Sequence, residues 1–166
     1  MEENSEELEL EVKMKDFVLI NENDFMKARK EIRKNNRKKI IFSGLDDELN
    51  RKILEKEKID VLLLNQSGRI DATKQRNSGF NHVLAKIAKK KNAAIGINFD
   101  EIMESGKKRK ADILGRVMQN VKLCNKNKLK MKFVFLKTKN EINIYDAKSL
   151  GLVLGMPTWM IKNLTS

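Results

Sequence analysis

Apolar residues recur along this chain in two alternating patterns, one typical of buried strands and one with the period of a helix. Short apolar runs predict strands over Phe17–Ile20, Lys39–Phe42, Asp60–Leu64, Ala93–Ile97 and Met131–Leu136. Between them, apolar residues spaced three and four apart predict helices from Asn23 or Asp24 to Asn35, from Asp46 or Asp47 to Lys58, and over Gly79–Lys91, Lys108–Asn127 and Ala147–Leu154. The polar stretch Asn65–Ser78 is predicted to be a long loop.

This alternation of strand and helix predicts a parallel sheet, because a helical crossover returns the chain to the same end of the sheet. The run Asp60–Leu64 lacks polar alternation, as expected for a strand that is covered on both faces. Five strands are fewer than the eight of a complete barrel, which takes ~250 residues. The pattern therefore fits either a shortened barrel or an open doubly wound sheet.

Charge is distributed unevenly along the chain. The whole sequence carries a net charge of +12, but Met1–Glu11 holds six Glu and no base, which leaves +18 on the remaining residues. We predict that residues 1–14 form a disordered acidic tail and that residues 15–166 form a single basic domain. A body this basic repels itself unless a polyanion neutralises it. RNA or DNA fits better than a membrane surface, because no basic helix also carries an aromatic-rich apolar face.

Few residues are suited to form a catalytic site within the protein. The chain has one His, His82, and one Cys, Cys124, so a His-rich metal site and an internal disulfide are both excluded. The single cysteine favours a cytoplasmic location. Asp100, Glu101 and Glu104 suit Mg²⁺ in their chemistry, but their spacing is better explained by capping of a helix. We expect no catalytic residue, and no metal or cofactor bound by the protein itself.

Basic residues are the positive evidence for a function. They gather in Lys27–Lys39, Lys86–Lys91, Lys107–Lys110 and Lys122–Lys132. Each cluster alone is typical of a solvated helix face, but four clusters on one small domain favour a surface that binds a polyanion. Aromatic residues make up only 5% of the chain and none lies in a base-stacking motif. We therefore expect contacts to the phosphates of a folded RNA rather than reading of its bases.

Three segments carry a family resemblance. The first is Arg76–Lys90, which contains Ser-Gly-Phe-Asn-His-Val-Leu, and the others are Gly115–Cys124 and Tyr145–Met156. Together they resemble the archaeal ribonuclease P protein component 3 family, over about residues 60–157. The resemblance implies a shortened, TIM-barrel-like fold of parallel βα units, similar to the barrel of metallo-phosphoesterases. It also implies a subunit of the ribonucleoprotein endonuclease that removes the 5′ leader from precursor tRNA.

Membership of that family implies a supporting role, in which the RNA partner is catalytic and requires Mg²⁺. The implied partners are ribonuclease P RNA, precursor tRNA, ribonuclease P protein component 2 and the other protein subunits, with no membrane. On the matched motifs and the neighbouring loop we predict RNA-binding residues at Lys74, Arg76, His82, Lys86, Lys91 and Arg116. Two alternatives remain, a general RNA-binding or ribosome-associated protein and an independent metal-dependent phosphoesterase.

Overall fold

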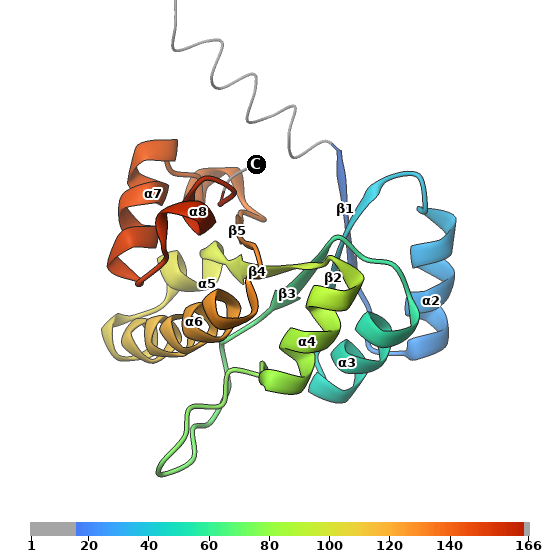
Figure 1. The fold of residues 1–166 in the computed structure, drawn as a ribbon, viewed down its shortest axis with the longest axis horizontal. Coiled ribbons are helices and arrows are strands. Elements are labelled where there is room, and N and C mark those ends of the chain that lie inside the picture. The colour runs from blue at the N-terminus through green and yellow to red at the C-terminus, as the bar shows by residue number, and fades with distance from the viewer. Residues whose placement is uncertain (1–15, 165–166) are drawn as a thin grey trace, which may run out of the picture.

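The computed structural model describes residues 16–164, which form a five-stranded sheet with helices between successive strands (Figure 1). The strands are β1 (Phe17–Asn21), β2 (Lys39–Ser43), β3 (Val61–Leu64), β4 (Ala94–Asn98) and β5 (Met131–Val134). The helices are α2 (Phe25–Lys34), α3 (Asp47–Lys56), α4 (His82–Lys91), α5 (Phe99–Glu104), α6 (Lys107–Asn127), α7 (Ile144–Val153) and α8 (Thr158–Ile161), with a 3₁₀ turn η1 (Thr138–Asn140). The predicted α/β alternation is confirmed, whereas the predicted acidic tail, residues 1–14, lies outside the described residues.

The order of the strands distinguishes the two sheet types that the sequence pattern allowed. All neighbouring strands pair in parallel and follow one another in sequence order, β1-β2-β3-β4-β5. A doubly wound sheet reverses its strand order at a switch point, whereas a barrel continues in one direction. The sheet therefore has the winding of a segment of a barrel, in agreement with the TIM-barrel-like topology.

The two faces of the sheet have different surroundings. Alternate strand residues such as Phe42, Leu62 and Ile95 pack with the helices in the main core. The other face holds a smaller apolar cluster of Ile41, Val61, Leu63, Ala94 and Val134, with Phe17 packed against it. Because β3 contributes to both clusters, all four of its residues are buried, as its unbroken apolar run predicts.

Side-chain caps fix where the helices begin. Asp24 accepts a hydrogen bond from the amide of Lys27 at the start of α2, and Asp46 accepts one from Glu48 at the start of α3. Asn81 caps α4 through the amide of Leu84, so this helix begins at His82 and not at the predicted Gly79. Among residues 16–164, no helix combines the length and the apolar content needed to cross a membrane.

Candidate nucleic-acid interface

The loop between β3 and α4, residues 65–81, leaves the carboxyl end of the sheet and is held in place by Arg116 of α6. The Nε of Arg116 donates to Asp71 Oδ1 at 2.8 Å, and its two terminal nitrogens donate to the carbonyl oxygens of Gln66 and Arg69, both at 2.9 Å. Only 4% of Arg116 is exposed. The guanidinium of Arg116 thus anchors the loop in this conformation, whereas the sequence predicts an RNA contact for this residue.

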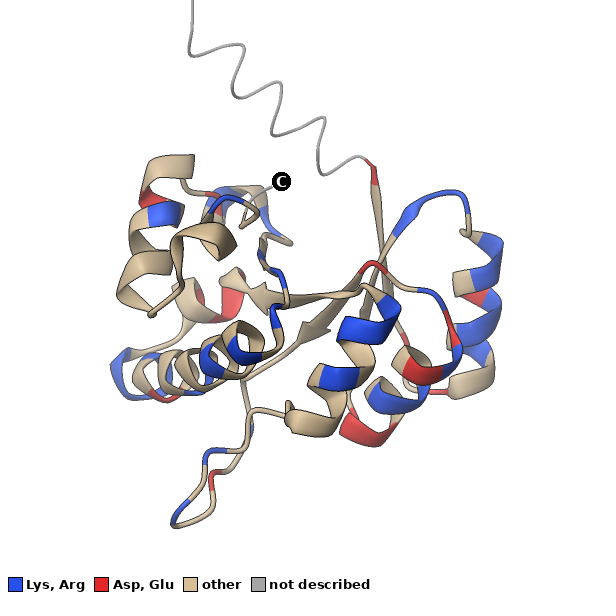
Figure 2. Ribbon diagram, in the orientation of Figure 1, with Lys and Arg blue, Asp and Glu red and all other residues tan. Residues whose placement is uncertain are grey.

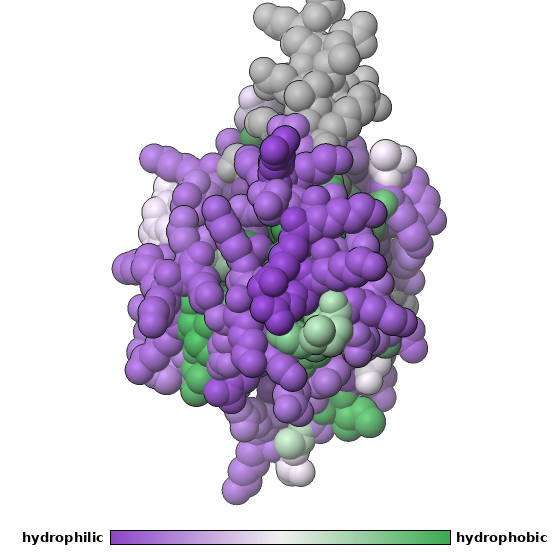
Figure 3. All heavy atoms as spheres, turned by 90° about the vertical axis from the view of Figure 1, so that its right-hand side faces the viewer, coloured by the Kyte–Doolittle hydropathy of each residue, from purple (hydrophilic) through white to green (hydrophobic). Residues whose placement is uncertain are grey.

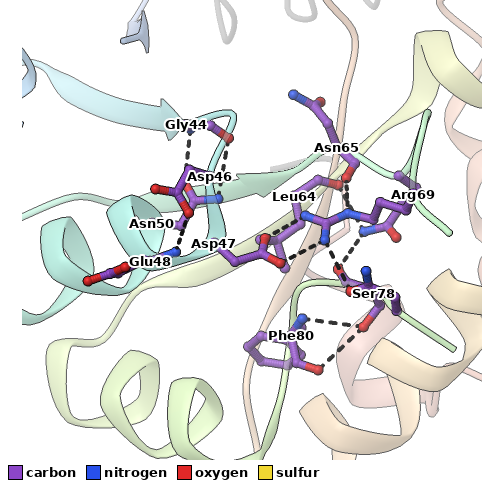
Figure 4. Close-up of polar contacts among 12 residues, drawn as sticks. Gly44, Asp46, Asp47, Glu48, Asn50, Leu64, Asn65, Arg69, Ser78 and Phe80 are labelled. Atoms are coloured by element: carbon purple, nitrogen blue, oxygen red, sulfur yellow. Dashed lines mark hydrogen bonds and ion pairs between the residues drawn. The ribbon is translucent and has the colours of Figure 1, made fainter. Parts of the chain in front are cut away.

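A second arginine ties the same loop to α3. Arg69 makes a bidentate ion pair with Asp47, at 2.7 and 2.9 Å, and its Nε donates to the carbonyl oxygen of Asn65 at 2.7 Å (Figure 4). Gly79 leaves room for this guanidinium, which a Cβ at that position would meet. Gly79 also has a φ of +70°, a conformation that other residues adopt only with strain. The glycine of the Ser-Gly-Phe-Asn-His motif therefore serves the packing of the loop.

Polar side chains link the carboxyl ends of three neighbouring strands. Asn65 donates to the hydroxyl of Ser43, and Asn98 donates to the side-chain oxygen of Asn65, both at 2.9 Å. Glu101 accepts hydrogen bonds from the backbone amides of Gln66 and Ser67, at 2.7 and 3.1 Å. These contacts fix the first residues of the loop. In the sequence, these contacts are indicated only by the polar residue that follows the apolar run of each of β2, β3 and β4. That position is the carboxyl end of the strands, where such folds build sites.

The predicted RNA-binding residues other than Arg116 are exposed. Arg76 lies 3.5 Å from Asp71, and its guanidinium rests where a side chain at Gly115 would otherwise lie. Lys74 is in the loop, His82 is the first residue of α4, and Lys86 and Lys91 follow along that helix. The structure therefore brings Arg76 beside Arg116 through Asp71, and distributes the lysines from the loop to the far end of α4.

Asp71 is the residue at the centre of this site that sequence reasoning missed. The hydrogen bond from Arg116 holds the pKa of the Asp71 carboxyl below its ordinary value, with help from the backbone amide of Asn77. The carboxylate therefore stays charged, and it offsets the positive charge of Arg116 and Arg76. No spacing rule in the sequence links Asp71 to a residue 45 positions away.

The acidic residues considered for Mg²⁺ are occupied by donors of the protein. Asp100 accepts from the amide of Leu136 at 2.8 Å and from Asn140 at 2.6 Å. Glu104 is paired with Lys137 and Lys139, and hydrogen bonds from Lys137 and Asn140 lower its pKa to about 2. Within the described residues, no three His, Cys, Asp or Glu side chains form a group suited to a metal ion. These two carboxylates, near the start and at the end of α5, join that helix to the segment after β5.

Cys124 has no role in chemistry at the surface. It is fully buried in the helix-side core, and this burial raises the pKa of its thiol far above the ordinary value. A thiol that stays protonated is a poor nucleophile and a poor metal ligand. Cys124 is therefore a core residue of α6, buried on the same side of the helix as Ile113, Val117 and Val121.

The exposed basic residues dominate the outside of the molecule. Figure 2 shows lysines and arginines along α2 and at the ends of α4 and α6. The face formed by α2 and its neighbours is mainly hydrophilic, with small separate apolar areas (Figure 3). Ion pairs neutralise only some of these bases, for example Arg29 and Arg33 with Glu57. A surface with this excess of positive charge is suited to contacts with phosphates.

Comparisons with known proteins agree with the resemblance in the sequence motifs. No model of a known protein family matches the chain. The ribonuclease P protein component 3 of Methanococcus maripaludis strain C7 is 30% identical over 106 residues, which are 64% of this chain and 43% of that protein. The protein of the same name from Methanothermobacter thermautotrophicus is 29% identical over 141 residues, 84% of this chain and 54% of that protein. The chain thus spans about half the length of these curated relatives.

A solved structure shares the fold. A chain in the cryo-EM structure of archaeal ribonuclease P with mature tRNA matches with a TM-score of 0.74 and 25% sequence identity, over 89% of this chain and 63% of that one. Sequence and fold thus both lead to proteins of archaeal ribonuclease P, and the resemblance is confirmed. The chain is similar in sequence to archaeal ribonuclease P protein component 3 and in fold to a chain of archaeal ribonuclease P.

Proposed function

We propose that this chain is an RNA-binding protein subunit of ribonuclease P, the ribonucleoprotein that removes the 5′ leader from precursor tRNA. The observation that carries the proposal is the likeness, over 89% of the chain, to a chain in archaeal ribonuclease P with mature tRNA. The basic, largely hydrophilic surface supports it, because phosphate contacts of this kind position a protein on folded RNA without reading sequence.

In this proposal the RNA catalyses cleavage with Mg²⁺ as its cofactor, and the protein supports the structure of the RNA. The side chains of the described part favour that division. His82 is exposed, the Cys124 thiol is held protonated in the core, and Asp100 and Glu104 are bonded to donors of the protein. None of these groups is arranged as a nucleophile with its base.

The proposed partners are ribonuclease P RNA, precursor tRNA held by the assembled enzyme, component 2 and the other protein subunits, in the cytoplasm. The loop 65–81 and the exposed Arg76 are the proposed contacts at the carboxyl end of the sheet. Their support is positional, because the loop is fixed by Arg116, Arg69 and Glu101, while the Arg76 side chain beside Asp71 stays 46% exposed.

A reconstitution tests the proposal. Ribonuclease P RNA and component 2 are assayed on precursor tRNA at moderate Mg²⁺, with and without this protein. We expect strong activation of cleavage only when the protein is present, and no cleavage by the protein alone. Cleavage by the protein without RNA would refute the supporting role and favour an independent phosphoesterase.

A general RNA-binding protein is the second candidate, favoured by the broad spread of exposed bases (Figure 2). The same reconstitution separates the two. A general RNA-binding protein binds unrelated structured RNAs as tightly as ribonuclease P RNA and leaves the cleavage of precursor tRNA unchanged.

A further inference from the structure

The connections that lead from each helix into the next strand gather at one end of the sheet. Because the strands are parallel and wound in one direction, the segments 33–39, 56–60, 89–93 and 126–132 all lie at the amino ends of the strands. Each segment carries two or more Lys or Arg, and Glu57 and Asp60 are the only acids in the four. Figure 2 shows these bases at the ends of α2, α4 and α6. We call these four segments the basic end.

The two acids of the basic end are already used by the protein. Glu57 is buried and pairs with Arg29 and Arg33, at 2.9 and 3.3 Å. Asp60 accepts a hydrogen bond from the backbone amide of Ile40 at 2.8 Å. The four segments thus hold no further acid that could pair with Lys39, Lys128 or Lys130.

A small cavity lies in the middle of the basic end. It has a volume of about 210 Å³ and is lined by Lys39, Lys89, Lys128, Lys130 and Lys132 together with Phe17 and Asp60. The ammonium groups of Lys39 and Lys132 lie 5.3 and 5.8 Å from the centre of the Phe17 ring. Ring faces hold these ammonium groups in place and leave their positive charge intact.

Ion pairing is lacking where the bases are densest. Within residues 16–164, Lys39, Lys128 and Lys130 form no ion pair with a carboxylate. Lys128 instead lies 5.6 Å from the centre of the Trp159 ring, and Lys89 donates to the carbonyl of Lys128 at 3.0 Å. Several like charges are thus held close together around one cavity, which costs free energy in the absence of an anion.

Helix dipoles account for only part of this concentration. Cations favour the carboxyl ends of helices, which explains Lys89–Lys91 in the last turn of α4. Lys39 is the first residue of β2 and Lys130 directly precedes β5, so no helix end requires these two lysines. The excess of charge on and before the strands needs another reason, and an external polyanion supplies one.

We propose that the basic end binds the phosphate backbone of a folded RNA and that the lysine-lined cavity receives one phosphate. This inference rests on the proposed function and adds a second RNA-binding face, at the opposite end of the sheet from the loop 65–81. RNA is favoured over an anionic membrane because none of the exposed large apolar side chains lies in the four segments. A membrane-bound surface would need such side chains to insert between lipids.

The experiment compares two triple variants of the full chain. One carries Lys39→Gln, Lys128→Gln and Lys130→Gln at the basic end. The matched control carries Lys52→Gln, Lys139→Gln and Lys148→Gln, which remove the same charge elsewhere; Lys52 also lies over an aromatic ring, 4.6 Å from the centre of Phe25. Binding to an archaeal ribonuclease P RNA transcript and to an RNA duplex is measured over a range of salt concentrations, and circular dichroism verifies folding.

Loss of three phosphate contacts should lower the slope of log affinity against log salt by roughly 2 to 3 in the basic-end variant, on both RNAs. The control should keep the slope of the unmodified protein. Equal slopes for the two variants would overturn the inference while leaving the proposed function intact, because reconstitution judges that function separately. An unmodified protein that binds neither RNA would overturn both. Loss of binding to phosphatidylserine vesicles, with RNA binding unchanged, would make the face a membrane site and also overturn the inference.

Discussion

Replacing Arg116 by Ala separates an anchoring role from an RNA contact. The guanidinium donates to the Asp71 carboxylate and to two backbone carbonyls, and it is 4% exposed. Removing one partner of a buried ion pair costs about 3–5 kcal/mol, and a buried carbonyl left without a donor costs about 1–3 kcal/mol. Asp71 is 24% exposed and keeps the amide of Asn77, which reduces the first cost. We therefore expect Arg116→Ala to lower the free energy of unfolding by about 2–4 kcal/mol.

The assay is urea unfolding followed by circular dichroism, combined with amide hydrogen exchange of residues 65–81. Exchange should accelerate at Asn77, whose amide is bonded to Asp71, because the loop loses its attachment to α6. The exposed Arg109→Ala, on the same helix, serves as the control and should change stability by less than about 0.5 kcal/mol. If Arg116→Ala leaves stability and exchange unchanged but weakens RNA binding, the anchoring role is refuted and the RNA contact predicted from the sequence is supported.

Three further predictions concern other parts of the molecule. The pKa of Glu104 is lowered to about 2 in the folded state, so its contribution to stability is complete above pH 4.5 and is lost as the pH falls from 4.5 towards 2. Glu104→Gln should therefore reduce the fall in melting temperature over that pH range, and an unchanged fall would contradict the ion pair. The first turn of α6 holds no acid to interact with the helix dipole, so Lys107→Glu should raise the free energy of unfolding by about 0.3–1 kcal/mol at low salt. Lys122→Glu, which lies outside the first turn, should not raise it, and equal effects of the two variants would argue against the helix dipole. Gly96→Ala should lower the free energy of unfolding, measured in urea, by about 1–3 kcal/mol, because the added Cβ would meet Val61 and the backbone of Leu63. A neutral result would mean that β3 and β4 adjust readily.

The helices and strands that the sequence predicts best are those with a long or unbroken apolar pattern. The ends of α2 and β3 lie within one residue of their predicted bounds, since capping by Asp24 and burial of Val61–Leu64 leave clear signals. The sequence predicts a helix start near Asp100 and Glu101 but not the bounds of α5, because six residues are too few to display a helical period. Helix α7 begins three residues before its predicted start, because Asn143 caps it through Asp146. Local hydrogen bonds of this kind leave little trace in an apolar pattern.

The candidate site was less predictable than the fold. The apolar residues that predict helix α6 are Ile113, Leu114, Val117, Met118, Val121 and Cys124, and this pattern places Arg116 at the surface. The structure buries it because the loop 65–81 folds back over α6, and the conformation of a long polar loop follows from pairings between distant residues. The ion pair between Arg69 and Asp47 is hidden from the sequence for the same reason. A basic residue in a matched motif can therefore be either a ligand contact or the support for one.

The winding of the sheet gives the charge pattern a physical meaning. Because every crossover runs in the same direction, each connection into a strand lies at one end and each connection out of a strand lies at the other. At the carboxyl end, four acids hold loops in place. Asp47 and Asp71 pair with arginines, Glu101 accepts from backbone amides, and Glu104 pairs with lysines. In the four segments of the amino end, Glu57 and Asp60 are the only acids, and Lys39, Lys128 and Lys130 beside the cavity form no ion pair within residues 16–164. Charged side chains thus stabilise the loops at the carboxyl end of the sheet, and unpaired lysines remain at the amino end, where we propose that RNA binds.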